Sequence, residues 1–353
     1  MHVTPALFGK QGVFGGAERY SLELARHMSQ LTRTRIVAFG ATPEAYKDCD
    51  LDVQVLGPAT AIRGHAFNRF HISLWNAIRG FDVVHCHQPC TFASEFASWA
   101  GWLRRQRVFA TDLGGGGWGA NSYFNTKKWF RKHLHISQYS RCVAGQEEWD
   151  RASVIYGGVD TELFVPQPSI AKEPLVVFAG RLMPHKGVDY LVQALPPGLR
   201  LELIGRPYNE SFLAVLKKHA EGKNVTFRHD CDDHDLILAY QRALCVVLPS
   251  VYRDCFGNES KVPELLGQTL MEGMACGTAA ICSNVASMPE VVVNEVTGFV
   301  VPPNDTESLG QRLIQLRDNR ELAKSLGEAG RKRILEHFTW RTVVNSCLRA
   351  YES

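Results

Sequence analysis

The sequence predicts an α/β protein with parallel sheets in two domains. The chain has 353 residues, which is too long for one ordinary hydrophobic core and suits two domains. Short apolar runs alternate with segments of helical periodicity, which is typical of parallel α/β sheets. A stretch with two prolines at 165–168 interrupts this alternation and is expected to link the domains. We therefore place the first domain at 1–165 and expect the second to begin at residue 166.

The composition is that of a globular protein, with 45% hydrophobic residues, 21% charged residues and a net charge of +3. So mild a charge does not indicate a nucleic-acid partner. There is no run of about eighteen apolar residues and no signal peptide, so we expect neither a membrane span nor export. The ten cysteines form no paired framework, and several lie in apolar runs. This suits reduced thiols and a cytoplasmic protein.

In the first domain, apolar runs predict strands at 3–8, 35–39, 53–56, 83–85 and 108–111. A glycine-rich turn containing Gly15 and Gly16 separates the first strand from the first helix. This turn does not match the dinucleotide-binding pattern, because the glycine spacing differs.

Polar residues follow two of these strands. His85, Cys86 and His87, with Cys90 beyond, superficially suggest a metal site, but successive strand residues point to opposite faces. A strand end beside a ligand cleft is therefore favoured over zinc. The next strand runs into Asp112, a candidate polar group, and then Leu113 and the glycines at 114–117. These glycines fit a mobile lid or a close approach to an acceptor, and equally an ordinary surface loop.

Basic and aromatic residues are interleaved in two further segments of this domain, 102–107 and 127–133. Such segments can lie on an anionic membrane surface. The alternative is a solvated basic helix face, which the sequence favours slightly.

The second domain opens with an apolar strand that runs into Gly180 and Arg181, followed by Lys186 at the start of a helix. A glycine turn with two nearby cations suits a diphosphate, since both cations neutralise its charge. It is not a P-loop, because the required spacing is absent. Further elements are expected as strands at 201–204, 224–227 and 245–248 and a helix at 236–244.

Glu264 and Glu272 stand eight residues apart in this domain, so one helix carrying both would place them on one face, about two turns apart. Pro263 could begin that helix. The free N–H groups of Leu265, Leu266 and Gly267 would then form an anion site. The alternative is a buried amphipathic helix with two solvated glutamates.

This pattern resembles the signature of the retaining glycosyltransferase family 4, in which two glutamates flank seven residues. The resemblance implies a GT-B fold, with two Rossmann-like, doubly wound domains facing across a cleft. It extends to Gly15-Gly16-Ala17-Glu18, to the histidine-containing strand end at 85–87, and to Gly180, Arg181, Lys186 and Gly187. It also implies that a helix at 338–353 crosses back to the first domain, which leaves 166–337 for the second. The sequence departs from the family at Leu113, where many members carry a histidine, and at 228–230.

The resemblance implies transfer of a sugar, with retention, from a nucleotide-diphosphate donor (UDP- or GDP-sugar) to a glycan, lipid-linked or small-molecule acceptor. Glu264 would contact the donor sugar, Glu272 the ribose, and Gly15 and Gly16 the donor phosphate or the acceptor. No metal or other cofactor is expected, because the two cations can stabilise the leaving diphosphate. The candidate residues are catalytic Glu264, Arg181 and Lys186; donor-binding Gly15, Gly16, Gly180, Leu265, Leu266, Gly267, Glu272 and Arg228; and, on the acceptor side, Asp112 and His85.

Two alternatives to a transferase stay open. One is a nucleotide-sugar epimerase of the same fold, which would convert the donor without an acceptor. The other is a catalytically degenerate partner or sugar-binding subunit, for which the missing histidine at Leu113 is the best support.

Overall fold

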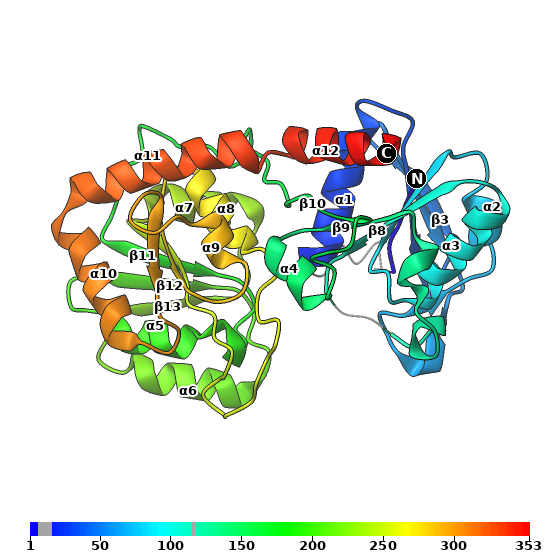
Figure 1. Ribbon diagram of the computed structural model, residues 1–353. Coiled ribbons are helices and arrows are strands. Elements are labelled where there is room, and N and C mark those ends of the chain that lie inside the picture. The colour runs from blue at the N-terminus through cyan, green and yellow to red at the C-terminus, as the bar shows by residue number, and fades with distance from the viewer. Residues whose placement is uncertain (6–15, 115–116) are drawn as a thin grey trace. The chain divides into compact units, whose positions relative to one another are not determined.

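The structure, a computed structural model, describes residues 1–5, 16–114 and 117–353. These residues form two compact units (Figure 1). Unit 1 comprises Met1–Gly158 together with Trp340–Ser353, and unit 2 comprises Val159–Thr339.

The chain enters and leaves unit 2 at neighbouring points. The Val159 N–H donates a hydrogen bond to the carbonyl oxygen of Phe338 at 2.8 Å, and Val159 forms an isolated parallel bridge with Thr339. The units therefore divide at Gly158 and Thr339, whereas the sequence placed the boundaries after 165 and before 338.

Unit 1 is built on an eight-stranded sheet in the order β10-β9-β8-β7-β1-β2-β4-β3. All neighbouring strands are parallel except β3 and β4. The strands are β1 (His2–Val3), β2 (Arg35–Phe39), β3 (Glu44–Asp48), β4 (Leu51–Leu56), β7 (Val83–His87), β8 (Arg107–Asp112), β9 (Lys132–His135) and β10 (Ala152–Val154), with a separate hairpin of β5 (Thr60–Ala61) and β6 (Arg69–Phe70). The α-helices are α1 (Gly16–Ser29), α2 (Leu74–Ala77), α3 (Phe92–Leu103), α4 (Gln138–Val143) and α12 (Trp340–Glu352).

Unit 2 is built on a six-stranded sheet in the order β13-β12-β11-β14-β15-β16, and every neighbouring pair is parallel. The strands are β11 (Leu175–Ala179), β12 (Arg200–Ile204), β13 (Val225–Arg228), β14 (Cys245–Leu248), β15 (Ala279–Ser283) and β16 (Gly298–Val301). The α-helices are α5 (Val188–Ala194), α6 (Glu210–Ala220), α7 (Asp233–Arg242), α8 (Gln268–Ala275), α9 (Met288–Val291), α10 (Thr306–Asp318) and α11 (Arg320–His337).

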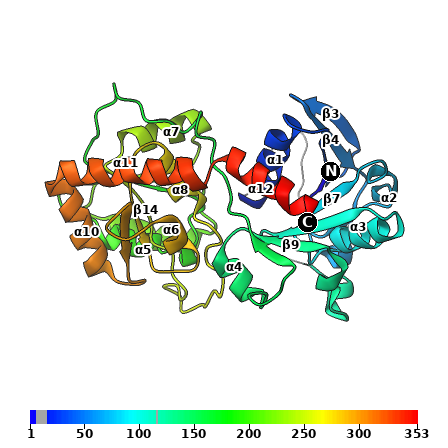
Figure 2. The ribbon, with the colours of Figure 1, turned by 45° about the horizontal axis from the view of Figure 1, so that its top comes forward.

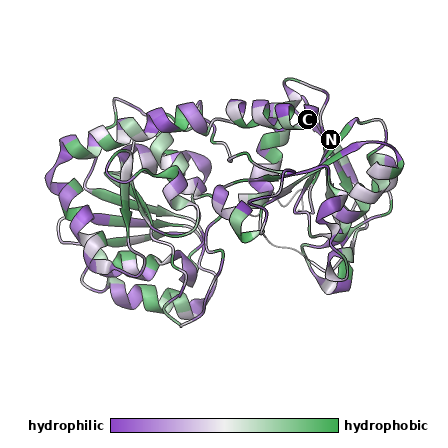
Figure 3. Ribbon diagram, viewed as in Figure 1, coloured by the Kyte–Doolittle hydropathy of each residue, from purple (hydrophilic) through white to green (hydrophobic). Residues whose placement is uncertain are grey.

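The central strands of unit 2 are apolar without alternation, as parallel strands between two helical layers must be. Every residue of β11, β14 and β15 is buried. Figure 3 shows the strands mainly in the hydrophobic colour, whereas most helices carry both colours. In the part of the chain that the structure describes, no helix has both the length and the apolar character needed to cross a bilayer.

The predicted fold class is confirmed, with parallel sheets in two units. The strands expected at 35–39 and 245–248 match β2 and β14 to the residue. The first strand was expected at 3–8, but β1 covers only His2–Val3, and residues 6–15 lie outside the described residues.

The last helix, α12, belongs to unit 1 and lies beside α1 (Figure 2). Its first residue, Trp340, stacks on the His27 ring with centroids 5.6 Å apart and contacts Tyr20 at the same distance. Near its other end, Tyr351 packs against Phe109 of β8. The core of unit 1 is thus completed by a segment that follows all of unit 2 in the sequence.

Candidate active site

In unit 2, the turn after β11 is held by glycines on both sides of Lys186. The Gly180 N–H donates to the carbonyl oxygen of Ile204 at 2.9 Å, which ties the turn to the end of β12. Gly187 has a φ of 65°, and a Cβ there would lie 2.0 Å from the carbonyl oxygen of Pro249. A residue without a Cβ is therefore needed for this turn to rest on the loop after β14.

Lys186 and Glu264 form an ion pair at this turn. The distance from Lys186 Nζ to Glu264 Oε2 is 2.5 Å, and the two side chains are 17% and 14% exposed. Burial, and then the charge of Lys186, lower the pKa of the neighbouring His185 below its usual value, so this ring is neutral at neutral pH. The structure thus brings together two of the predicted catalytic residues, which are 78 positions apart in the sequence.

The helix that carries Glu272 begins later than predicted. It is α8, which spans Gln268–Ala275, and Glu264 lies in the loop before it. Gly267, the residue that caps the helix, has a left-handed φ of 74°, which a right-handed helix cannot continue through. The prediction of one helix that begins after Pro263 and carries both glutamates is therefore wrong, and Leu265, Leu266 and Gly267 lie before the helix instead of in its first turn.

Glu272 is buried inside unit 2, with 3% of its surface exposed. The Tyr240 hydroxyl donates to its Oε2 at 3.3 Å. Leu266 is also buried and Leu265 is half-buried, so the loop from Glu264 to the helix is packed rather than free in solvent. The two glutamates thus have different surroundings: Glu264 pairs with a lysine in a loop, and Glu272 lies in the interior.

The two predicted arginines of unit 2 also differ. Arg181 is exposed, and its guanidinium makes no ion pair or hydrogen bond with any residue among 1–5, 16–114 and 117–353. Arg228 ends β13 and pairs with Glu202 and Asp235, each at 3.2 Å. Arg181 therefore offers a charge that the described residues leave unneutralised, whereas Arg228 is held by two carboxylates.

In unit 1, the glycine-rich turn is only partly described. Gly15 lies outside the described residues. Gly16 is the exposed first residue of α1, and a Cβ on it would meet nothing within 4 Å. The described part of this turn therefore shows no steric need for glycine.

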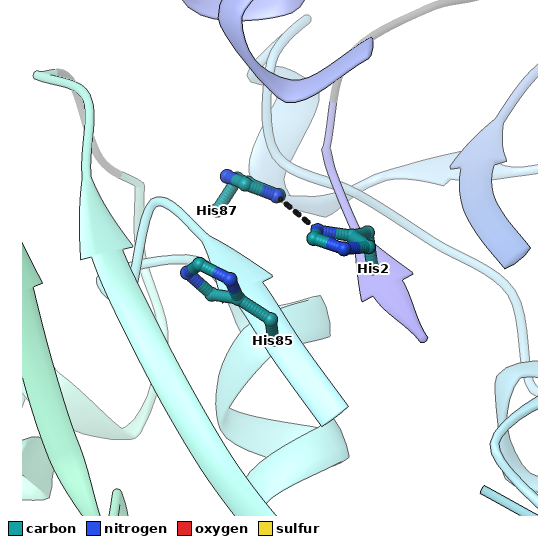
Figure 4. A group of neighbouring side chains, drawn as sticks. All are labelled: His2, His85 and His87. Carbon is teal, nitrogen blue, oxygen red and sulfur yellow. Dashed lines mark hydrogen bonds between the residues drawn. The ribbon is translucent and has the colours of Figure 1, made fainter. Parts of the chain in front are cut away.

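Three histidines gather on the neighbouring strands β1 and β7 (Figure 4). His2 Nδ1 and His87 Nε2 share a hydrogen bond of 3.0 Å. His85 Nδ1 bonds the Tyr351 hydroxyl at 2.6 Å, and its Nε2 bonds the Thr111 hydroxyl at 2.7 Å. Burial lowers the pKa of all three rings, that of His87 to about 3. The cluster is therefore neutral at neutral pH.

This cluster corrects the role expected for His85. The ring is 1% exposed and both of its nitrogens already have protein partners, so it cannot contact an acceptor in this structure. Instead it holds Tyr351 of α12. Sequence reasoning missed His2 and the hydroxyl of Tyr351, and it did not note that strand alternation puts His85 and His87 on one face.

The same three histidines present one ring nitrogen each within 4.8 Å of one another. Neutral imidazoles can bind metals, but the ring nitrogens of His2 and His85 already form hydrogen bonds. A second group, Asp232, His234 and Asp235, lies largely exposed. The expectation of a metal-independent site rests on the cations of unit 2 and stays a prediction.

Asp112 ends β8, where its Oδ1 accepts a hydrogen bond from the Gly114 N–H at 2.9 Å. In the sheet register its neighbour is His135, the last residue of β9. His135 is buried, and its Nδ1 has no hydrogen-bond partner among the described residues. Sequence reasoning missed His135, although it too stands at a strand end in the segment HISQYS.

Glu95 is a further residue that the sequence did not single out. This buried carboxylate of α3 accepts hydrogen bonds from the N–H groups of Ala120 and Asn121 at 2.6 and 2.7 Å and from the Thr126 hydroxyl at 3.1 Å. It therefore fixes the segment that follows the four glycines. Its only sequence signal is a charged residue within an otherwise uncharged helix.

Two family models match this chain. Residues 160–333 match the model described as Glycosyl transferases group 1, and residues 14–163 match that described as Glycosyltransferase Family 4. The two matches overlap at residues 160–163, close to the start of unit 2 at Val159, so each model matches most of one unit.

Curated relatives are similar over part of their length. The alpha-maltose-1-phosphate synthase of Mycolicibacterium smegmatis is 31% identical over 57% of this chain and 57% of its own length. The GDP-mannose-dependent alpha-(1-6)-phosphatidylinositol monomannoside mannosyltransferase of the same organism is 29% identical over 52% of each. The chain thus matches little more than half the length of these relatives.

Solved structures share the fold over almost the whole chain. A sucrose-phosphate synthase from Thermosynechococcus elongatus has a TM-score of 0.77 at 21% identity, covering 99% of this chain and 97% of that one. HepE of Anabaena, solved with UDP and glucose, has a TM-score of 0.73 at 16% identity, covering 99% and 98%. At such low identity these likenesses concern the arrangement of the backbone.

Proposed function

The chain belongs to the group 1, family 4 glycosyltransferases with the GT-B fold. We therefore propose that it transfers a sugar from a nucleotide-diphosphate donor to an acceptor hydroxyl, with retention of configuration at the anomeric carbon. The observation that carries the proposal is the ion pair between Lys186 and Glu264 at the glycine turn after β11. This pair places a cation for the diphosphate beside an acceptor of hydrogen bonds for the sugar.

Donor binding would exchange the partners of this pair. A diphosphate carries more negative charge than one carboxylate, so Lys186 would pair with the diphosphate instead of with Glu264. The exposed Arg181 would be a second cation for the diphosphate. Glu264 would then be free to accept hydrogen bonds from the hydroxyl groups of the donor sugar. In the absence of the donor, Lys186 and Glu264 therefore neutralise each other's charge.

In the reaction, the bond from the anomeric carbon to the diphosphate oxygen breaks and the acceptor oxygen bonds to the same face of that carbon. The electron pair of the broken bond leaves with the diphosphate. Lys186 and Arg181 stabilise the charge that develops there, which is usually the largest catalytic contribution. The departing phosphate oxygen takes the proton of the acceptor hydroxyl, so no side chain is assigned as general base.

We propose a UDP- or GDP-sugar as the donor. Support comes from relatives, since one is named as GDP-mannose-dependent and HepE was solved with UDP and with UDP-glucose. The two cations support catalysis without a metal ion. All ten cysteines are unpaired in the structure, which supports a reducing, cytoplasmic setting.

The test is a thermal-shift panel of UDP, GDP, ADP and their sugars on the wild type and on Lys186→Ala. A ligand that binds only the folded protein raises the unfolding midpoint. We expect one nucleotide class to stabilise the wild type, and Lys186→Ala to lose that shift. Lys217→Ala, an exposed lysine on α6, serves as the matched control and should keep it.

Product analysis separates this proposal from the two alternatives. A transferase releases nucleoside diphosphate only when an acceptor is present, and an epimerase converts the donor without one. A catalytically inactive partner subunit does neither. Nucleotide binding without acceptor-dependent release under any acceptor tested would contradict the proposed transfer.

A further inference from the structure

Two basic-aromatic segments that are separate in the sequence meet in unit 1. They line one groove of about 720 Å³, formed by the end of α3, the start of β8, the segment before β9 and the segment before β10. Its lining residues are Ser98, Trp102, Arg105, Gln106, Arg107, Val108, Lys128, Trp129, Phe130, Arg131, Lys132, Asp150, Arg151 and Ser353. We call this the basic groove.

The basic groove lies at the amino ends of β8 and β9, since Arg107 and Lys132 are the first residues of these strands. Ligands of open α/β sheets bind at the opposite edge, beyond the carboxyl ends. Asp112 and His135 lie at that edge. The basic groove is thus a surface separate from the candidate acceptor residues of unit 1.

Large apolar side chains are exposed in the basic groove and on the helix that borders it. Trp102 is 72% exposed, Trp99 and Leu103 are each 48% exposed, and Trp129 is 44% exposed; of these, Trp102 and Trp129 line the groove. The first three end α3, and the Ser98 hydroxyl of the same helix donates to the Trp129 carbonyl oxygen at 2.8 Å, which joins the fourth to them. Such a group of exposed apolar side chains is unusual on a protein surface that faces water, and it marks an interaction site.

Three cations of the basic groove are not used within the protein. The side chains of Arg105, Lys128 and Arg151 form no ion pair or hydrogen bond with any residue in the described part of the chain. Arg107 and Arg131, by contrast, donate to the carbonyl oxygens of Tyr351 and Ser353. The charges of the first three are therefore available to an external anion.

We propose that the basic groove and the aromatic end of α3 bind the surface of a bilayer that contains anionic phospholipids. Indole rings prefer the headgroup region of a bilayer, and each lysine or arginine near an anionic surface adds to the attraction. The apolar tips would enter the boundary between headgroups and acyl chains while the cations pair with lipid phosphates. This inference stands apart from the proposed transferase activity and does not need it.

A nucleic acid or an acidic polysaccharide is the main rival occupant. Tryptophans could stack on bases or sugars, but the exposed aliphatic side chain of Leu103 has no such partner and gains only from hydrocarbon. Three of the four apolar residues also lie together at the end of α3 rather than spaced along the basic groove. These features favour a lipid surface.

The experiment is co-sedimentation of the full chain with vesicles of phosphatidylcholine alone or of phosphatidylcholine mixed with phosphatidylglycerol. We expect binding to the mixed vesicles only, and a loss of binding at high salt because exposed charges are screened. Arg105→Gln/Lys128→Gln/Arg151→Gln should lower the partition coefficient about 100-fold, at about 5-fold for each charge removed. Trp102→Ala should lower it about 10-fold through lost apolar contact.

Matched variants in unit 2 provide the controls. Lys217→Gln/Lys218→Gln/Lys324→Gln removes three exposed lysines, and Tyr208→Ala removes an aromatic ring that is 66% exposed; both should bind as the wild type does. Circular dichroism establishes that every variant is folded. Equal binding to neutral vesicles, an equal loss in the control triple variant, or retention on heparin or single-stranded RNA without vesicle binding would overturn the proposal. No nucleotide is added, so the outcome is independent of the thermal-shift panel.

Discussion

At the scale of single residues, the main feature of the candidate site is that the charge of Lys186 is already paired with Glu264. Lys186 and Glu264 satisfy each other at 2.5 Å in the unliganded chain. Any anion that binds Lys186 must therefore compete with Glu264, and any ligand that needs the Glu264 carboxylate must first separate it from Lys186. Removing the Glu264 carboxylate should therefore raise the affinity for a nucleoside diphosphate and lower the rate of turnover.

We predict that Glu264→Gln binds free nucleoside diphosphate more tightly than the wild type and turns over donor more slowly. Removing the competing carboxylate leaves Lys186 to the diphosphate, and a partly exposed pair contributes up to about 1 kcal/mol, or about fivefold in affinity. Isothermal titration with the diphosphate that stabilises the wild type measures this. Glu259→Gln, in the same surface loop, is the control, and weaker binding by Glu264→Gln would refute the competition.

The residues on this site were partly predictable from the sequence. Gly180 and Lys186 could be placed in one turn from the local sequence, because only five residues separate them. Glu264 was singled out by its spacing from Glu272, but its position in a loop and its pairing with Lys186 did not follow from that spacing. His85 did not follow, because its role depends on Tyr351, which is 266 positions away and contributes through a hydroxyl that no local pattern marks. Glu95 did not follow for the same reason, since its partners lie in a later loop.

At the scale of elements, the turn between β11 and α5 depends on close packing against the loop after β14. Gly187 directly precedes α5 and has a left-handed φ, and its missing side chain leaves room for the Pro249 carbonyl group. Because Lys186 precedes this glycine directly, the packing also fixes where the cation stands.

We predict that Gly187→Ala destabilises unit 2 and abolishes the nucleotide-dependent thermal shift. Both Gly187 and Gly222 have positive φ, of 65° and 73°, but a Cβ on Gly222 would meet nothing within 4 Å. Gly222→Ala therefore pays only the backbone strain, whereas Gly187→Ala should cost about 1–3 kcal/mol more through overpacking. Urea unfolding of both variants measures the difference, and equal midpoints would contradict the role of the contact.

Several elements were predictable, since apolar runs and turns determined β2 and β14 to the residue. The start of α8 was not, because Pro263 and Gly267 both offer a possible boundary. Propensity favours a helix that begins after the proline, but the chain places Gly267 in a left-handed conformation. The residue before this glycine, Leu266, is buried, so the segment after the proline is packed as a loop.

At the scale of the whole molecule, unit 1 is held together by groups from both ends of the described chain. His2 belongs to β1, His85 and His87 to β7, and Tyr351 to α12. Their rings lie in the interior and are linked in pairs by hydrogen bonds. Protonating any of these imidazoles would place a charge where water cannot reach it.

We predict that the protein loses stability as the pH falls below about 6.5, the pKa of an unfolded histidine. The folded pKa values are lowered, so in this range the unfolded chain binds protons that the folded chain does not. Each histidine then costs about 1.4 kcal/mol per pH unit. Urea unfolding between pH 7 and 5 should show a shallower slope for His87→Gln, whereas His337→Gln, at an exposed helix end, should keep the wild-type slope.

The position of α12 has a consequence for the order in which the protein is made. Translation delivers the strands of unit 1 first, then the whole of unit 2, and only afterwards the helix that covers Tyr20 and His85. Domains usually fold in the order in which they leave the ribosome. Unit 2 is continuous in the sequence, so it can fold during synthesis. Unit 1 still lacks α12 at that stage, and the apolar face that α12 covers remains exposed. The synthesis of unit 1 therefore begins first, but its folding is completed last.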